Sequence, residues 1–195
     1  FKYVGGNAQH IIIPKEVMEM DCLLIYEGAS FFQGSLAEPV SCIIGACHAM
    51  YHTKMGSYVH HMEVKESGNM AILAGVGPMG LGAIDYAVNQ PIKPKKLVVT
   101  DINDTRLERA KEIYSEEWAA SHGVELIYVN TGKVDDPVEY LKSLVDGDGY
   151  DDVFVFAPVK PVVEQGDAIL GLDGCLNFFA GPTDKNFSAT FNFYN

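Results

Sequence analysis

From Gly68 onward, short continuous apolar runs alternate with longer mixed stretches. Such runs are typical of parallel strands buried on both faces, and we predict helices between them. The predicted strands are 70–74, 96–100, 124–129, 153–156 and 175–180, and the predicted helices are 79–88, 105–121, 138–145 and 162–170. This order predicts an α/β fold with a doubly wound parallel sheet and right-handed crossovers. The alternating segment 188–193 is a candidate sixth strand.

The chain before Gly68 is less regular. The β-branched run His10–Ile13, ended by Pro14, predicts a short strand. Because a strand needs a partner, we expect a segment of the intact protein to precede this one. Apolar positions at three- and four-residue steps predict an amphipathic helix from Leu36 to about His52.

Composition narrows the classes of protein. The chain has 195 residues and a net charge of −12, which fits one large domain or one domain with part of another. The acidic balance disfavours nucleic acid and anionic membrane surfaces as partners. No apolar run approaches the roughly 20 residues that span a bilayer. Four cysteines without a CxxC pair indicate reduced thiols and a cytoplasmic protein.

The stretch AILAGVGPMGLGAI carries the most specific motif. Gly75, Gly77 and Gly80 have G-x-G-x-x-G spacing between a predicted strand and a predicted helix. Asp101 ends the next predicted strand, 21 positions after Gly80. This context, more than the glycines alone, predicts a dinucleotide-binding loop.

Each motif position has a physical task in that prediction. Gly75 permits the tight turn, Gly77 lets a diphosphate approach the backbone, and Gly80 lets helix and sheet pack closely. The helix that begins with Pro78 and Met79 offers free N–H groups and a positive dipole end to the diphosphate. Asp101 would accept hydrogen bonds from the adenine ribose and repel a 2′-phosphate, which favours NAD over NADP. Arg106 would contact the same ribose or lie over the adenine.

Two other interpretations of the loop stay open. The glycines could serve only close strand–helix packing. A methyltransferase also combines a glycine loop with an acid at a strand end, although Pro78 and the full three-glycine spacing disfavour it.

The succession GGNAQHIIIP, LAEPVSCIIGACHA, AGVGPMGLGAI and VVTDINDTRLERAKE resembles the zinc-dependent medium-chain dehydrogenases over nearly the whole chain. It is most similar to their sorbitol dehydrogenase and sorbose-phosphate reductase branch. The resemblance implies that residues 1–36 are the tail of a GroES-like catalytic domain with its linker. Residues 37–195 are then a Rossmann-type dinucleotide-binding domain whose final strand is expected to lie outside this chain.

The resemblance also implies a zinc role for Glu38. It matches the position from which polyol dehydrogenases supply a carboxylate to the catalytic zinc, and the family places a Cys and a His–Glu pair earlier, before Phe1. Three protein ligands and one open position are usual for catalytic zinc. From the residues alone, Glu38 is equally a carboxylate stabilised by a helix N-terminus.

The implied function is NAD-linked hydride transfer between an alcohol and a ketone of a polyol or sugar phosphate. We expect this chain alone to bind dinucleotide without catalysis. The alternatives are a zinc-free reductase of the same superfamily and a dinucleotide sensor. Family members pair through the edge of this sheet, so the resemblance implies a homo-oligomer, with 188–195 as a candidate interface.

Several polar residues point to no chemistry. We expect adjacent His60 and His61 at the surface, His48 in the core, and His52 at a helix C-terminus. The acidic stretch that contains Asp146, Asp148, Asp151 and Asp152 predicts a solvated turn. Ala157-Pro158 stands where the family often has Thr-Gly beneath the nicotinamide.

Overall fold

The computed structural model describes residues 8–193. The chain divides into two compact units, Phe1–Glu38 and Pro39–Asn195. The identity of residues 1–36 as the tail of a GroES-like domain stays a prediction.

The first unit contains little regular structure. Its helices are α1 (Lys15–Glu19) and α2 (Phe31–Ser35). The strand predicted at 10–13 does not form, and Ile12 is 74% exposed. The described part of this unit contains no strand with which the run could pair, and an isolated strand is not stable.

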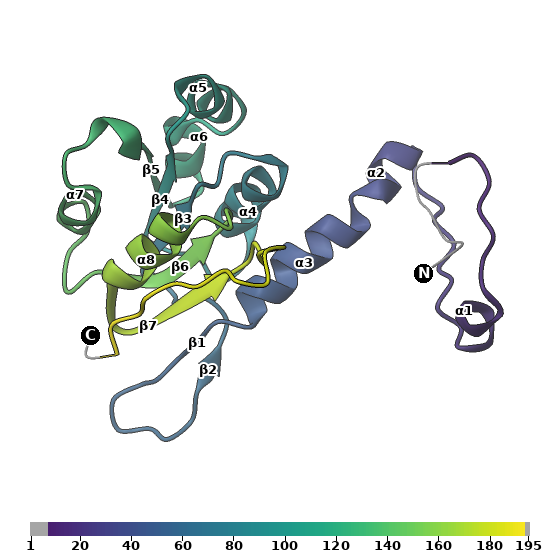
Figure 1. Ribbon diagram of the computed structural model, residues 1–195, viewed down its shortest axis with the longest axis horizontal. Helices are drawn as coiled ribbons and strands as arrows, with labels where there is room; N and C mark the ends of the chain where they lie inside the picture. The colour runs from purple at the N-terminus through teal and green to yellow at the C-terminus, as the bar shows by residue number, and fades with distance from the viewer. Residues whose placement is uncertain (1–7, 194–195) are drawn as a thin grey trace. The chain divides into compact units, whose positions relative to one another are not determined.

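The second unit is built on a five-stranded, wholly parallel sheet (Figure 1). Its strands are β3 (Asn69–Leu73), β4 (Lys96–Asp101), β5 (Glu125–Asn130), β6 (Tyr150–Val155) and β7 (Leu170–Phe178). The spatial order is β5-β4-β3-β6-β7. The chain therefore moves outward from β3 in one direction, then returns to β6 on the other side of β3.

Helices cover both faces of this sheet. They are α3 (Ala37–His48), α4 (Pro78–Asn89), α5 (Asp104–Ile113), α6 (Glu116–Ser121), α7 (Pro137–Ser143) and α8 (Lys160–Ala168). One apolar cluster joins Ile72 of β3 to side chains of α3–α6, and the other joins Ala71 to side chains of α7 and α8. Successive strand residues thus serve opposite faces, which confirms the predicted doubly wound α/β fold.

Several predicted elements have different bounds; β7, for example, begins at Leu170, five residues before the strand predicted at 175–180. The helix predicted over 105–121 is two helices, because the chain leaves α5 at Tyr114 and Ser115 caps α6 by accepting a hydrogen bond from the Trp118 N–H. The helix predicted to reach His52 ends at His48. Beyond it, β1 (Tyr51–His52) pairs antiparallel with β2 (His61–Met62).

The sixth strand predicted at 188–193 does not form among the described residues. Two carboxylates of α8 instead accept hydrogen bonds from this segment: Glu164 from the Thr190 N–H and Asp167 from the Asn192 N–H.

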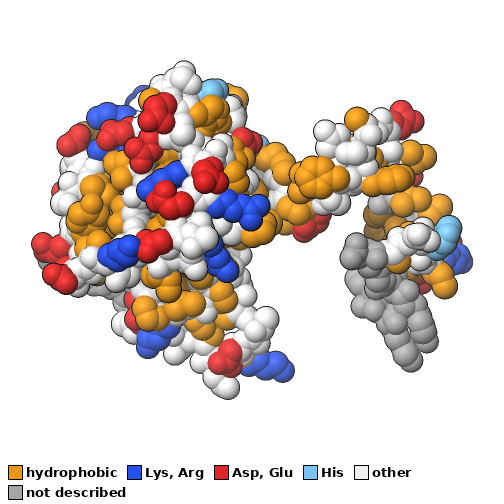
Figure 2. Space-filling view, turned by 90° about the horizontal axis from the view of Figure 1, so that it is seen from above, with side chains coloured by type: hydrophobic (Ala, Val, Ile, Leu, Met, Phe, Trp, Pro, Cys, Tyr) orange, Lys and Arg blue, Asp and Glu red, His pale blue; other side chains and the backbone are white. Residues whose placement is uncertain are grey.

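The surface carries both signs of charge. On the face of the second unit that Figure 2 shows, acidic and basic side chains are interspersed rather than gathered into one acidic patch. Within residues 8–193, no helix is both long and apolar enough to cross a bilayer.

Candidate dinucleotide site

A cavity of ≈ 370 Å³ lies at the carboxyl ends of the strands. Gly77 lines it after β3, Asp101 at the end of β4, Thr131 after β5 and Phe156 after β6, while Gln165 contributes from α8. It lies where the strand order reverses, between β3 and its neighbours β4 and β6. Doubly wound sheets bind ligands at this switch point.

The glycine loop forms the floor of the cavity, and its glycines differ in their surroundings. A Cβ at Gly80 would lie 2.0 Å from the backbone oxygen of Gly75, so only glycine allows this approach of α4 to the end of β3. A Cβ at Gly75 would lie 2.0 Å from Cγ2 of Ile72. A Cβ at Gly77 would meet nothing within 4 Å, yet Gly77 lines the cavity. Gly75 and Gly80 therefore shape the loop, whereas Gly77 leaves room for a ligand beside it.

Helix α4 begins at the cavity without a side-chain cap. Gly77 is its N-cap and has no side chain to accept from the first N–H groups, and Pro78 occupies the first turn. Unpaired N–H groups and the helix dipole make such an end favourable for an anion. The Met79 side chain packs against the apolar core, so only its backbone is placed to contribute here.

The loop is tied to β4 by backbone geometry. Ala74 has φ +52°, a left-handed conformation that costs a non-glycine residue about 1–2 kcal/mol. Two hydrogen bonds hold the turn: the Ala74 N–H donates to Thr100 Oγ1 at 3.3 Å, and the Gly75 N–H donates to Thr100 O at 3.0 Å. Thr100 thus places the glycine loop beside Asp101.

Asp101 is 8% exposed and lines the cavity. Its Oδ1 accepts hydrogen bonds from the N–H groups of Ile102 at 2.8 Å and Asn103 at 2.9 Å. Within the described residues its Oδ2 accepts none, so that oxygen is available for a ligand. Arg106, in the first turn of α5, also lines the cavity, and its guanidinium has no ion pair in residues 8–193.

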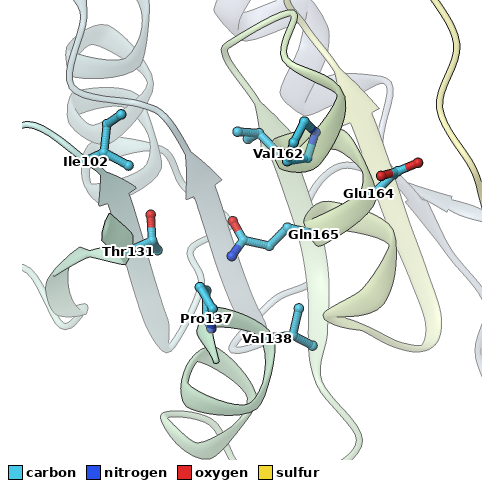
Figure 3. Close-up of a pocket in the computed structure, with 8 residues that line it drawn as sticks. Ile102, Thr131, Pro137, Val138, Val162, Glu164 and Gln165 are labelled. Atoms are coloured by element: carbon cyan, nitrogen blue, oxygen red, sulfur yellow. The ribbon is translucent and has the colours of Figure 1, made fainter. Parts of the chain in front are cut away.

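The two ends of the cavity differ in chemistry. Near β6 the walls are apolar, from Phe156 to Val159. At the β5 end the cavity adjoins a second one of ≈ 470 Å³, lined also by Pro137 of α7 (Figure 3). The residues that line both cavities are Ile102, Thr131, Val162 and Gln165. The two cavities therefore form one continuous groove, whose walls the sequence did not indicate.

The predicted zinc ligand Glu38 is an exposed residue in the first turn of α3. Within residues 8–193, no three His, Cys, Asp or Glu side chains gather so that they could hold a metal ion. The described residues therefore do not form a zinc centre, and the zinc role of Glu38 stays a prediction.

The opposite edge of the sheet holds a buried pair that the sequence analysis missed. His52 Nε2 lies 2.9 Å from Asp152 Oδ1, and the two residues are 5% and 1% exposed. His52 Nδ1 lies 3.2 Å from the Asp173 carbonyl oxygen. Because both ring nitrogens face acceptors, the surroundings favour the protonated imidazole, which can donate on both sides. The hydrogen bond to Asp152 is the main reason that the pKa of His52 is raised.

Three sequence-based expectations are therefore wrong. His52 is not at a helix C-terminus but in β1. The acidic stretch is a solvated turn at Asp146 and Asp148, as expected, but Asp152 is buried in β6. Asp151 is also structured, because it accepts a hydrogen bond from the Asn69 N–H and pairs with Lys65. His48 is exposed rather than in the core, with its Nε2 3.1 Å from the Tyr86 hydroxyl. The expected surface position of His60 and His61 is confirmed.

Comparison with known proteins adds close relatives. The chain is 57% identical over its full length to the mannitol-1-phosphate 5-dehydrogenase of Aliivibrio fischeri and 48% identical to the L-sorbose 1-phosphate reductase of Klebsiella pneumoniae. It spans 46% of the length of each, about half of these curated relatives.

Fold comparison agrees with the sheet described above. A zinc-binding dehydrogenase from Sinorhizobium meliloti 1021, solved with NADP bound, superposes with a TM-score of 0.61 at 20% identity, over 83% of this chain and 40% of its own. The family described as zinc-binding dehydrogenase matches residues 78–195, which run from the start of α4 through the rest of the sheet. The chain therefore belongs to the zinc-binding dehydrogenase family.

Proposed function

We propose that the groove binds a nicotinamide dinucleotide. The observation that carries the proposal is the juxtaposition of the uncapped start of α4 with Asp101 at the switch point of the sheet. The diphosphate lies against Gly77 and the first N–H groups of α4. The adenine ribose donates hydrogen bonds to the free Oδ2 of Asp101, and the nicotinamide lies toward Phe156–Pro158.

The cofactor in this proposal is NAD rather than NADP. A 2′-phosphate on the ribose would lie beside the ionised Asp101 and be repelled, since like charges at close range in a partly buried site interact strongly. Arg106 lies at the same end of the cavity and supplies a positive charge near the ribose. One acidic and one basic side chain thus flank the sugar.

The reaction in this proposal is hydride transfer between the carbinol carbon of a polyol or sugar phosphate and the nicotinamide. Two relatives whose names specify sugar-phosphate substrates, mannitol 1-phosphate and L-sorbose 1-phosphate, support it. This chain contributes the cofactor half of the site, in a homo-oligomeric cytoplasmic enzyme. Cys22, Cys42, Cys47 and Cys175, all within residues 8–193, form no disulfide, and this supports a reducing compartment.

Titration calorimetry with NAD and with NADP tests the proposal. The wild-type chain should bind NAD more tightly, and Asp101→Ala should bring the two affinities together. Asp104→Ala is the matched control, because that carboxylate is exposed, pairs with Lys133 and does not line the cavity. No heat with either dinucleotide would defeat the proposal, and an unchanged preference in Asp101→Ala would remove Asp101 as the discriminator.

A further inference from the structure

The order of the strands fixes which part of a dinucleotide reaches which wall. The uncapped helix follows β3, Asp101 ends β4, and Thr131 follows β5, so these groups succeed one another across the sheet. A dinucleotide with its diphosphate at Gly77 and its ribose at Asp101 therefore extends its adenine toward the end of β5. The residues that line both cavities lie there.

One polar side chain near the end of β5 has no hydrogen-bond partner in the described part of the chain. Gln165 is half-buried, and its side-chain amide makes no hydrogen bond in the part of the chain that the structure describes. Figure 3 shows the amide reaching from α8 into the cavity, toward the space between Thr131 and Pro137. Its neighbours Ile102 and Val162 are apolar and cannot pair with it.

The adjacent acid is already engaged. Glu164 Oε1 accepts a hydrogen bond from the Thr190 N–H at 2.9 Å and lies 3.6 Å from Lys160 Nζ. Thr131, which also lines both cavities, offers a single hydroxyl, whereas the planar amide of Gln165 presents a donor and an acceptor side by side. Apolar walls enclose the faces of a flat ring, while the amide meets its edge.

We propose that Gln165 reads the edge of the adenine and makes this site specific for adenine dinucleotides. The inference rests on the proposed function and adds a specificity-determining residue to it. A side-chain amide pairs with the N6/N7 edge of adenine through two hydrogen bonds: its oxygen accepts from N6–H, and its NH₂ donates to N7. On the same edge hypoxanthine has two acceptors, O6 and N7, so the amide can make only one of the two bonds and its oxygen faces an acceptor in either orientation.

The test compares NAD with nicotinamide hypoxanthine dinucleotide by calorimetry on the wild-type chain and on Gln165→Leu. The wild type should bind NAD about 10-fold more tightly, which corresponds to about 1.4 kcal/mol, because hypoxanthine leaves the amide oxygen or its NH₂ group without a partner. Gln165→Leu, which keeps the size but removes both hydrogen-bonding groups, should bind the two dinucleotides alike. Gln33→Leu is the matched control, because this glutamine lies in α2 and lines no part of the groove.

The possible results distinguish the role of Gln165 from dinucleotide binding itself. NAD binding without preference in the wild type, or a preference that survives in Gln165→Leu, would overturn the role of Gln165 and leave the dinucleotide site intact. Absence of binding by any dinucleotide would overturn both. The wild-type comparison needs no variant, so a folding defect in Gln165→Leu does not prevent a decision.

Discussion

The aspartates at the two edges of the sheet differ in whether their carboxylate oxygens are all hydrogen-bonded within the chain. At the amino-terminal edge, Asp152 accepts from His52 through Oδ1 and from the Lys65 N–H through Oδ2, so both oxygens are used within the chain. At the carboxyl-terminal edge, Asp101 has one oxygen bonded to its own loop and the other open to the cavity.

Other polar groups repeat the contrast. Asp173 at the amino-terminal edge accepts from the Thr53 N–H at 2.7 Å, whereas the start of α4 and the amide of Gln165 at the other edge have no side-chain partner in the described residues. Buried polar groups are normally satisfied within the fold. The open oxygen of Asp101 and the uncapped start of α4 therefore mark the carboxyl-terminal edge as the ligand edge, and the other edge serves stability. At that other edge, Gln90 Nε2 at the C-cap of α4 is the one buried side-chain nitrogen or oxygen without a partner in residues 8–193.

Removing each aspartate in turn should reveal the largest difference in stability between the two edges. Asp152→Ala should cost about 3–5 kcal/mol in the free energy of unfolding, because it leaves His52 buried without the partner that favours its protonated form. Asp101→Ala should cost about 1 kcal/mol, since it removes two hydrogen bonds from loop N–H groups. Urea denaturation measures both.

The matched control is Asp148→Ala, an exposed aspartate of the same acidic stretch, which should stay within about 0.5 kcal/mol of wild type. Equal losses for Asp101→Ala and Asp152→Ala would contradict the division of the sheet into a structural edge and a ligand edge.

A second test lies within the ligand edge. Gly80→Ala places a Cβ 2.0 Å from the Gly75 backbone oxygen, so α4 must move, at a cost of about 1–3 kcal/mol in stability. Gly77→Ala meets no atom within 4 Å and should leave stability unchanged, yet weaken NAD binding at least 10-fold, because its methyl group enters the cavity. Denaturation and calorimetry on both variants measure the two effects. Equal destabilisation by both substitutions would show that the loop has no glycine reserved for the ligand.

The structural edge should also respond to pH. The folded-state pKa of His52 is raised above its ordinary value of about 6.5, chiefly by the hydrogen bond to Asp152. The stabilisation is then fully present below about pH 6.5 and is lost as the pH rises through the folded-state value, at up to about 1.4 kcal/mol per unit of pKa shift. Asp151 and Asp173, which also lie near the imidazole, act in the same direction.

Denaturation at pH 6 and at pH 8.5, with NMR titration of the ring protons, measures this effect. Asp152→Asn should lower the pKa of His52 and remove the loss of stability, whereas His122→Gln, at an exposed histidine, should keep it. A wild-type stability that does not fall between the two pH values would show that His52 is not held charged.

The fold was predictable because its signal is local. The central strands β3, β4 and β6 contain continuous apolar runs, such as Leu97–Val99, whose residues are fully buried on both faces. The edge strand β7 has no such run and is only half-buried, so its predicted start was five residues late. The break between α5 and α6 was missed although its cap, Ser115, is visible in the sequence. The run His10–Ile13 was misread because an apolar pattern does not reveal whether a partner strand exists.

The site was predictable only where its residues are neighbours along the chain. Gly75, Gly77, Gly80 and Asp101 follow two successive strands, so their spacing carries the signal. Gln165 joins them only through the return of the chain to β6, beside β3. His52 and Asp152 are 100 residues apart, and their pairing depends on where the β1–β2 hairpin packs. Neither the position of Gln165 in the site nor the contact of His52 with Asp152 can be recognised from a local sequence pattern.

The smallest expected effect concerns the strained backbone of Ala74, in the turn after β3 at the ligand edge. Ala74 holds φ +52°, which glycine adopts without cost and alanine adopts at about 1–2 kcal/mol. Ala74→Gly removes that strain but adds about 0.4–1 kcal/mol of unfolded-state entropy. Because the two terms nearly offset each other, stability should rise by no more than about 1 kcal/mol, with NAD affinity unchanged while Thr100 holds the turn. A loss of NAD affinity in Ala74→Gly, measured by calorimetry, would show that the strained alanine itself orders the loop for its ligand.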